Sequence, residues 1–257
     1  MPLVDVSGLH FRYPTERGRN RTWTLKNLNL SIEKSSSVGI VGESGSGKST
    51  LVRILCGILI HQEGAVDFDG RPLKDWLSES PRELRRRNQI VFQSPRRSLD
   101  PRMSIRKSLS QPVRAIERRT PSDDEMTGWL TRVGLTDEVL PRFPHQLSGG
   151  QLQRVGVARA LSVGPEVLYA DEPTSALDVS VQAQVLNLLM DIRKQLGLTL
   201  VVVSHDLAVI SRICEDVIVM RDGEIVESGR MTQVLSHPAD PYTAALVDSA
   251  RTVSLEA

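Results

Sequence analysis

A short run rich in glycine and serine, with a single lysine, carries the strongest chemical pattern in this sequence. Gly42 to Ser49 fits the pattern G-x-x-x-x-G-K-[ST]. The glycines allow backbone N–H groups to converge on one anion, the Lys48 amine adds positive charge, and the Ser49 hydroxyl can ligate Mg²⁺. We predict a phosphate-binding loop rather than a simple glycine turn. The expected nucleotide-binding residues are Gly42, Glu43, Ser44, Gly45, Ser46, Gly47, Lys48, Ser49 and Thr50.

Two adjacent carboxylates follow the apolar run Val167–Ala170. A buried strand that ends in Asp171 and Glu172 places two acids where they are costly without a cation or a substrate. We predict that Asp171 holds Mg²⁺, directly or through water, and that Glu172 polarises an attacking water as general base. Solvated acids at a surface strand end are the alternative.

A phosphate loop requires a strand before it and a helix after it. Val38–Val41 is a short apolar run that suits the strand, and residues 50–59 are apolar enough for a buried helix. Further apolar runs separated by helical segments predict a mainly parallel sheet. These runs are Ile90–Phe92, Val167–Ala170, Thr199–Val203 and Val217–Met220.

Short-period alternation predicts half-buried antiparallel strands at Leu3–Tyr13 and Leu25–Glu33, joined by a polar loop over 14–20. Arg221–Gly223 predicts a hairpin turn, and Gly197 stands where a helix C-cap belongs. The helix before Gly197 has one apolar face of period 3.6. That face comprises Val181, Val185, Leu188, Leu189, Ile192 and Leu196.

Composition excludes several classes of protein. The 257 residues are 40% hydrophobic and 25% charged, which is ordinary for a globular chain and excludes disordered and fibrous classes. A net charge of +1 gives no overall reason to expect a nucleic-acid partner. Cys56 and Cys214 have no metal-ligand spacing, as expected in a reducing compartment. No secretory signal is visible, and no apolar stretch approaches the roughly 18 residues of a membrane helix.

Leu147–Gln151 resembles the signature motif of the ABC ATPases. The resemblance extends along most of the chain: Gln93 matches the Q-loop, Ser175–Asp178 the D-loop, His205 the switch histidine and Tyr13 the adenine-stacking aromatic. Each of these residues alone has an ordinary structural interpretation, but their order and spacing favour the family. The resemblance implies catalytic roles for Glu172, His205 and Gln93, Mg²⁺ ligation by Ser49, Gln93 and Asp171, a D-loop role for Asp178, and ATP contact from a second subunit by Leu147, Ser148, Gly149, Gly150 and Gln151.

The resemblance also implies the fold and the way in which the protein works. We expect an α/β P-loop NTPase core with a mainly parallel sheet, an N-terminal antiparallel β-subdomain and an inserted α-helical subdomain. The expected boundaries are 1–93 with 165–235 for the core, 94–164 for the helical subdomain and 236–257 for a C-terminal tail. ATP and Mg²⁺ would be sandwiched between two cassettes, so that binding closes a dimer and hydrolysis reopens it.

Further motifs resemble the ATPases of oligopeptide, dipeptide and nickel importers: Phe92–Pro95, Ser98–Pro101, Arg142–Gln146, Asp178–Gln184 and His237–Thr243. Many peptide-importing members continue into a cysteine-rich extension that this sequence lacks. The expected cargo is therefore nickel or another metal chelate, with a dipeptide or oligopeptide as the close alternative.

The expected partners are a second ABC ATPase subunit in a heterodimer, two integral membrane permease subunits and a separate solute-binding protein, with no nucleic acid. The expected location is peripheral, on the cytoplasmic side of the inner membrane. A soluble ABC ATPase that acts on DNA or ribosomes is one alternative, and a non-hydrolysing nucleotide-binding module is another, disfavoured by Glu172 and His205. Arg85–Arg87 is interpreted as a solvated helix face rather than a nucleic-acid patch.

Overall fold

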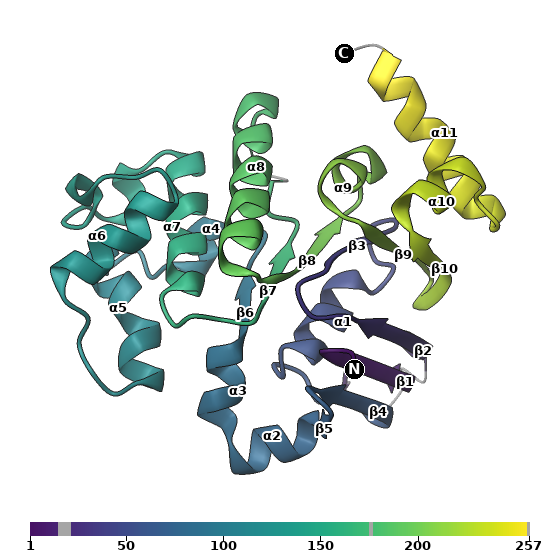
Figure 1. Ribbon diagram of the computed structural model, residues 1–257, viewed down its shortest axis with the longest axis horizontal. Coiled ribbons are helices and arrows are strands. Elements are labelled where there is room, and N and C mark those ends of the chain that lie inside the picture. The colour runs from purple at the N-terminus through teal and green to yellow at the C-terminus, as the bar shows by residue number, and fades with distance from the viewer. Residues whose placement is uncertain (15–21, 175–176, 256–257) are drawn as a thin grey trace. The chain divides into compact units, whose positions relative to one another are not determined.

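The computed structural model describes residues 1–14, 22–174 and 177–255 (Figure 1). The predicted polar loop at 14–20 therefore lies almost wholly outside the described residues. The chain divides into two compact units, Met1–Ser80 with Thr199–Ala257, and Pro81–Leu198. The boundaries predicted for core, helical subdomain and tail remain a prediction.

The first unit contains an antiparallel sheet in the order β2-β1-β4-β5. Its strands are β1 (Val4–Phe11), β2 (Leu25–Ile32), β4 (Glu63–Phe68) and β5 (Arg71–Pro72). The predicted antiparallel pairing of β1 with β2 is confirmed, with Val4 opposite Ile32. The sequence analysis missed β4, which pairs with the other edge of β1 and has only Val66 and Phe68 buried. Two buried side chains are too short a pattern for a strand to be recognised locally.

A second group of strands in this unit follows the order β10-β9-β3-β8. β3 (Ser37–Val41) pairs in parallel with β8 (Thr199–Ser204) and with β9 (Asp216–Arg221), and β10 (Glu224–Arg230) is antiparallel to β9. Every residue of β3 and β8 is buried. Strands buried on both faces are continuously apolar, which is why these two were visible as uninterrupted runs.

Helices and turns complete the first unit. The predicted hairpin is confirmed, because Asp222 (φ 50°) and Gly223 (φ 83°) both have the positive φ of a tight two-residue turn. The helix predicted over 50–59 is α1, Lys48–Leu55, and it ends earlier than expected, before Gly57 at φ 71°. The other helices are α2 (Leu73–Glu79), α9 (Leu207–Ile213), α10 (Met231–Ser236) and α11 (Pro241–Leu255). Figure 1 shows α10 and α11 in yellow beside β10.

The second unit contains a parallel strand pair and most of the helices. β6 (Asn88–Val91) pairs in parallel with β7 (Val167–Asp171). Residues 94–164, whose backbone is described throughout, contain helices and no strand, as predicted. The helices are α3 (Pro81–Arg87), α4 (Pro95–Ser98), α5 (Ile105–Ile116), α6 (Asp123–Arg132), α7 (Gly149–Leu161) and α8 (Val179–Leu196), with 3-10 turns at Asp137–Val139 and Pro144–Gln146.

The helix α7 is the centre of this unit, because α4, α5, α6, α8 and β6 all contact it. Leu152 is completely buried, which explains an apolar residue directly after the signature glutamine. The predicted apolar face of α8 is correct in the middle of the helix, where Val185, Leu189 and Ile192 are buried. It is wrong at Leu196, which is 43% exposed in the last turn, before Gly197 ends the helix at φ 64°.

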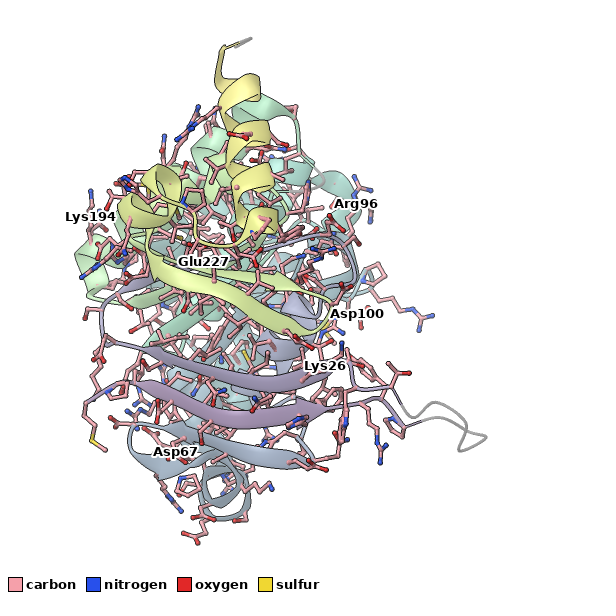
Figure 2. The ribbon with its side chains drawn as sticks, turned by 90° about the vertical axis from the view of Figure 1, so that its right-hand side faces the viewer. Lys26, Asp67, Arg96, Asp100, Lys194 and Glu227 are labelled. Atoms are coloured by element: carbon pink, nitrogen blue, oxygen red, sulfur yellow. The ribbon has the colours of Figure 1, made fainter. Side chains whose placement is uncertain are left out.

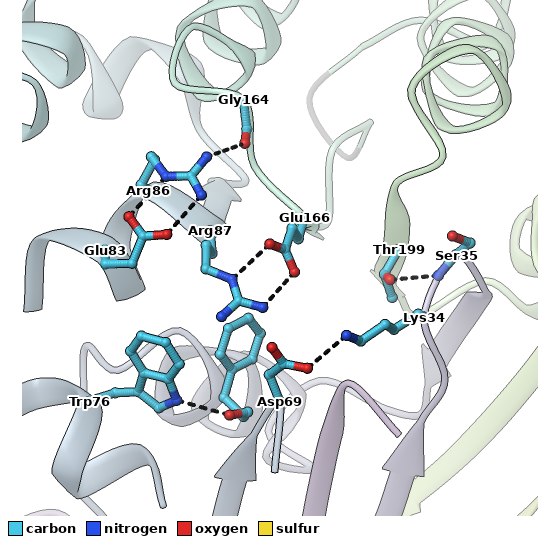
Figure 3. Close-up of polar contacts among 11 residues, drawn as sticks. Lys34, Ser35, Asp69, Trp76, Glu83, Arg86, Arg87, Gly164, Glu166 and Thr199 are labelled. Atoms are coloured by element: carbon cyan, nitrogen blue, oxygen red, sulfur yellow. Dashed lines mark hydrogen bonds and ion pairs between the residues drawn. The ribbon is translucent and has the colours of Figure 1, made fainter. Parts of the chain in front are cut away.

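The basic triplet at the end of α3 is only partly a solvated face. Arg86 makes two hydrogen bonds to the Glu83 carboxylate, at 3.0 and 2.7 Å (Figure 3). Arg87 is buried and makes two hydrogen bonds to Glu166, at 2.8 and 2.7 Å. Arg85 alone matches the prediction of an exposed, solvated side chain. Two of these three arginines therefore have their charge matched within the chain.

Candidate nucleotide-binding site

The glycine-rich loop lies where β3 ends and α1 begins. Gly42 has φ 154°, and a Cβ there would lie 2.0 Å from the carbonyl oxygen of Met220 in β9, so a side chain is excluded by backbone. Gly45, at the turn of the loop, has φ 87° and open space around it. The loop thus packs against β9 on one side and leaves its turn accessible, an arrangement suited to an anion at the N-terminus of α1.

Lys48 is 4% exposed, and its amine contacts the backbone of the loop. Its Nζ donates to the carbonyl oxygens of Gly42 and Glu43, each at 2.7 Å. A buried ammonium must be compensated, and here carbonyl dipoles of the loop do so. The positive charge of Lys48 therefore lies against the backbone carbonyls of the loop, and its contact with a phosphate remains a prediction.

Tyr13 lies beside α1. Its hydroxyl is 3.1 Å from the Thr50 Oγ1, and its ring meets the Phe11 ring edge-on at 4.9 Å between centroids. The residue is still 41% exposed. An anchored, exposed aromatic ring beside the phosphate loop suits stacking with a base.

His205 directly follows β8, and the parallel register pairs Val41 with Ser204. His205 and Gly42 therefore both follow the carboxyl ends of adjacent strands, the edge at which α/β sheets bind ligands. His205 is exposed, and the next residue, Asp206, accepts hydrogen bonds from the first turn of α9. Asp206 therefore caps the N-terminus of α9 and fixes the backbone conformation immediately after His205.

In the second unit, Gln93 and Glu172 are brought together. Parallel pairing of Val91 with Ala170 carries both residues to the same end of the β6–β7 pair. Gln93 Nε2 donates to Glu172 Oε2 at 2.5 Å. Glu172 has φ 45°, a left-handed conformation that is costly for a residue with a side chain and is concentrated at functional sites.

Asp171 is 3% exposed at the last position of β7. Its carboxylate, the Ser49 hydroxyl and the Gln93 amide are hard oxygen donors of the kind that Mg²⁺ prefers. The Gln93 nitrogen donates to Glu172, and the oxygen of the same amide is the atom that can ligate a cation. The chemistry of these donors fits the predicted metal.

The signature residues begin α7. Ser148 is the N-cap: its Oγ accepts from the Gln151 N–H at 3.2 Å, and the Gln151 Oε1 accepts from the Ser148 N–H at 3.0 Å. A Cβ on Gly150 would lie 2.7 Å from Val181 Cγ1 in α8, so any larger residue would force the Val181 side chain to shift. Ser148 is exposed and Leu147 is buried. The capping box thus presents a helix N-terminus and a serine hydroxyl to solvent.

The D-loop is described only in part, because Ser175 and Ala176 lie outside the described residues. Asp178 is the N-cap of α8 and accepts from the Val181 N–H at 2.9 Å. A Cβ on Gly149 would lie 3.3 Å from the Leu177 side chain, so the signature and the D-loop pack closely within this unit.

Sequence reasoning missed two contributors to the loop. The Glu43 N–H donates to the Tyr242 hydroxyl at 2.9 Å, and the Gly223 N–H of the hairpin donates to the Ser46 carbonyl at 3.1 Å. The only signal for the first was the His237–Thr243 motif, interpreted solely as a family marker. The second had no signal beyond the hairpin itself.

The glycine-rich loop lies between a buried parallel strand and a helix, and two adjacent acids follow a parallel strand of the second unit. These features define a P-loop nucleotide-binding protein. A family model described as "ABC transporter" matches residues 25–175. The chain is 38% identical to the oligopeptide transport ATP-binding protein OppF of Salmonella typhimurium, over 96% of this chain and 77% of OppF. It is 41% identical to the dipeptide transport ATP-binding protein DppF of Haemophilus influenzae, over 96% and 78%.

Solved structures agree. A dimeric structure of the ATP-binding cassette MJ0796 bound to ADP and Pi has a TM-score of 0.79 and 32% identity, over 89% of this chain and 98% of that one. The protein cbiO1 of Clostridium perfringens also has a TM-score of 0.79, with 30% identity over 92% and 91%. The chain belongs to the ABC transporter family, as an ATP-binding subunit of the oligopeptide and dipeptide importer type.

The predicted class, fold, enzymatic activity and cofactors are thereby confirmed. The protein is a transport-coupled ATPase that binds ATP with Mg²⁺, and subunits of this type work as a cassette dimer with membrane permeases. Among the described residues, no helix combines the length and apolarity needed to cross a membrane.

Proposed function

We propose that this chain energises the uptake of dipeptides or oligopeptides. The observation that carries the proposal is a phosphate loop with a buried lysine on a chain that aligns over 96% of its length with peptide-importer ATPases. OppF and DppF are named for oligopeptide and dipeptide transport, and a further relative, GsiA, is named for glutathione import. These names favour peptide over the nickel or other metal chelate that the sequence analysis expected. None of the three proteins is named for nickel, DNA or ribosomes.

The proposed nucleotide contacts begin at the phosphate loop and extend to the metal ligands. The loop amides and Lys48 bind the phosphates, and the exposed ring of Tyr13 stacks on the adenine. When bound, Mg²⁺ neutralises phosphate charge, with Ser49, Asp171 and the Gln93 oxygen as its protein ligands. The support is the donor chemistry of these groups together with the geometry of the loop.

Glu172 is the proposed general base. Its left-handed backbone and the bond from Gln93 fix one carboxylate oxygen, so that the carboxylate is held ready to orient a water and take its proton. His205 is proposed to contact the γ-phosphate as that water attacks. Because the carboxylate is orientated before the substrate arrives, little reorganisation is needed in the transition state.

The exposed N-terminus of α7 is the proposed contact to ATP held by a second cassette. Ser148, Gly149 and Gly150 offer a hydroxyl and backbone N–H groups, whereas the side chain of Gln151 serves the capping box. Asp178 is proposed to face the same partner. ATP would then hold the dimer together, and its hydrolysis would release it.

The proposed partner cassette is a different ATPase subunit, in a transporter with two permease subunits and a separate solute-binding protein. The chain is proposed to be peripheral, on the cytoplasmic face of the inner membrane. The support is the resemblance to importer ATPases whose motifs recur here from Phe92 to Thr243.

The test is a pull-down from membranes with Glu172→Gln protein loaded with Mg-ATP, followed by uptake assays. Recovery of a permease pair and a second cassette, with uptake of labelled dipeptide that depends on this chain, would support the proposal. Uptake of nickel but not of peptide would show that the cargo is a metal and would overturn the peptide assignment. Recovery of ribosomes or DNA-bound proteins instead would overturn the transport role.

A further inference from the structure

A side chain of the C-terminal helix α11 is hydrogen-bonded to the backbone of the phosphate loop. The N–H of Glu43, the second residue of the loop, donates a 2.9 Å hydrogen bond to the hydroxyl of Tyr242, 199 positions later. The carbonyl of the same peptide group is that of Gly42, and it accepts from Lys48 Nζ at 2.7 Å. Both polar ends of one peptide are thus held by side chains, one from the loop and one from α11.

The backbone around Tyr242 is itself anchored. Glu227 on β10 (Figure 2) accepts hydrogen bonds from the N–H groups of Ala239 and Asp240, at 2.9 and 3.1 Å. The Asp240 carboxylate accepts from the Tyr242 N–H at 2.8 Å and so caps the start of α11. The segment before α11 is therefore hydrogen-bonded to the sheet, and these bonds fix the backbone position from which the Tyr242 side chain extends.

The ring of Tyr242 is fixed as well. The side chain is nearly buried, and the Arg221 guanidinium lies over the ring at 5.1 Å. Arg221 precedes the hairpin turn whose Gly223 N–H donates to Ser46 in the loop. Burial raises the pKa of the Tyr242 phenol, so the group that faces Glu43 is a neutral hydroxyl at physiological pH.

We propose that Tyr242 is a positioning residue for ATP: its hydroxyl holds the Gly42–Glu43 peptide in the orientation that the bound nucleotide requires. Lys48 Nζ binds the carbonyl side of this peptide from within the loop, and the Tyr242 hydroxyl binds its N–H side from α11, so the tyrosine supplies a side-chain contact from outside the loop that sets the peptide plane. A loop ordered in advance loses less entropy on binding. The proposal rests on the assignment of Gly42–Ser49 as the nucleotide loop.

The experiment compares Tyr242→Phe with wild type in direct binding of a fluorescent ATP analogue and in steady-state hydrolysis. The variant keeps the ring and its contact with Arg221 and removes only the oxygen. We expect the Kd and the KM for ATP to rise about two- to tenfold, the effect of one lost hydrogen bond, with kcat nearly unchanged. Glu227→Ala, which loosens the anchor, should shift Kd in the same direction.

Thr243→Val is the matched control. Thr243 is the next residue of α11, and its buried hydroxyl has no hydrogen-bond partner among the described residues. Its replacement should leave Kd and KM at their wild-type values. An equal rise in Kd for both variants would show a general effect of the helix and overturn the proposal.

Lys48→Ala, measured in the same assay, distinguishes a failure of the Tyr242 proposal from a failure of the nucleotide-loop assignment. Loss of binding in Lys48→Ala together with wild-type Kd and KM in Tyr242→Phe would overturn the role of Tyr242 alone. Normal binding in Lys48→Ala would overturn the loop assignment and the proposal with it. A lower melting temperature of Tyr242→Phe with unchanged Kd and KM would mean that the tyrosine only stabilises the tail.

Discussion

Gln93 donates a 2.5 Å hydrogen bond to Glu172, a residue 79 positions later whose backbone is held at φ 45°. The bond orientates the Glu172 carboxylate and the Gln93 amide, whose oxygen is the atom able to ligate a cation. Strand pairing brings the two side chains together, because Val91 and Ala170, each two residues earlier, are in register. The arrangement combines a strained acid with an amide that orientates it.

Glu172→Gln should retain ATP binding and lose hydrolysis. Removal of a general base costs about 10²- to 10⁴-fold in kcat, or about 3 to 5 kcal/mol of barrier. Single-turnover hydrolysis and nucleotide binding, measured on the same protein, check this. Turnover at the wild-type rate would remove the assignment of Glu172 as base.

Lys48→Ala should act on binding. The variant removes the positive charge that lies under the loop, so the affinity for ATP should fall about 10- to 100-fold, in line with the loss of charge-assisted hydrogen bonds. Lys34→Ala is the control, because Lys34 makes an ion pair with Asp69 at 2.7 Å instead of reaching the loop (Figure 3). Equal affinities in the two variants would contradict the prediction.

Gly150→Ala should destabilise the second unit, because its Cβ would lie 2.7 Å from Val181 Cγ1. We expect a loss of about 1 to 2 kcal/mol in the free energy of unfolding, since overpacking outweighs the gain in helix propensity. The double variant with Val181→Ala should recover part of the loss.

Gly156→Ala is the matched control on the same helix, because nothing beyond the backbone of its own helix lies within 4 Å of its added Cβ. It should stabilise the protein by about 0.5 to 1 kcal/mol through helix propensity alone. Urea denaturation of the variants distinguishes the two glycines, and equal effects at both positions would show that packing against Val181 is not the cause.

His61 should make the protein sensitive to mild acid. Burial, reinforced by the nearby positive charge of Lys74, lowers the pKa of His61 below its ordinary value of 6.5. The unfolded chain then binds a proton more readily than the folded one, so the contribution of His61 to stability is complete above pH 6.5. It is lost as the pH falls from there through the folded pKa.

The measurement is the free energy of unfolding of wild type and His61→Phe at several pH values. The difference between the two proteins should be constant above pH 7 and should change in favour of the variant as the pH falls below about 6.5. A difference that stays constant from pH 8 to pH 5 would show that His61 is not responsible.

Local patterns were sufficient for much of the architecture and for the candidate residues. The loop at Gly42–Ser49, the buried runs that became β3 and β8, the hairpin at Arg221–Gly223 and the cap at Gly197 all depend on neighbours within a few positions. The order of the motifs also identified the family, because each motif combines residue types that the chemistry of phosphate binding demands at fixed spacing.

Only the tertiary structure decided which distant groups meet. The strand β4 carries too short an alternation to be recognised alone, and Leu196 is exposed although it continues the apolar face of α8. Strand register, not local sequence, brings Gln93 to Glu172, and the sheet anchors the tail that carries Tyr242 to Glu43. The sequence by itself determined the chemistry that each group can perform. The distances that allow groups to act together depend on long-range packing, which periodicity and motif spacing do not encode.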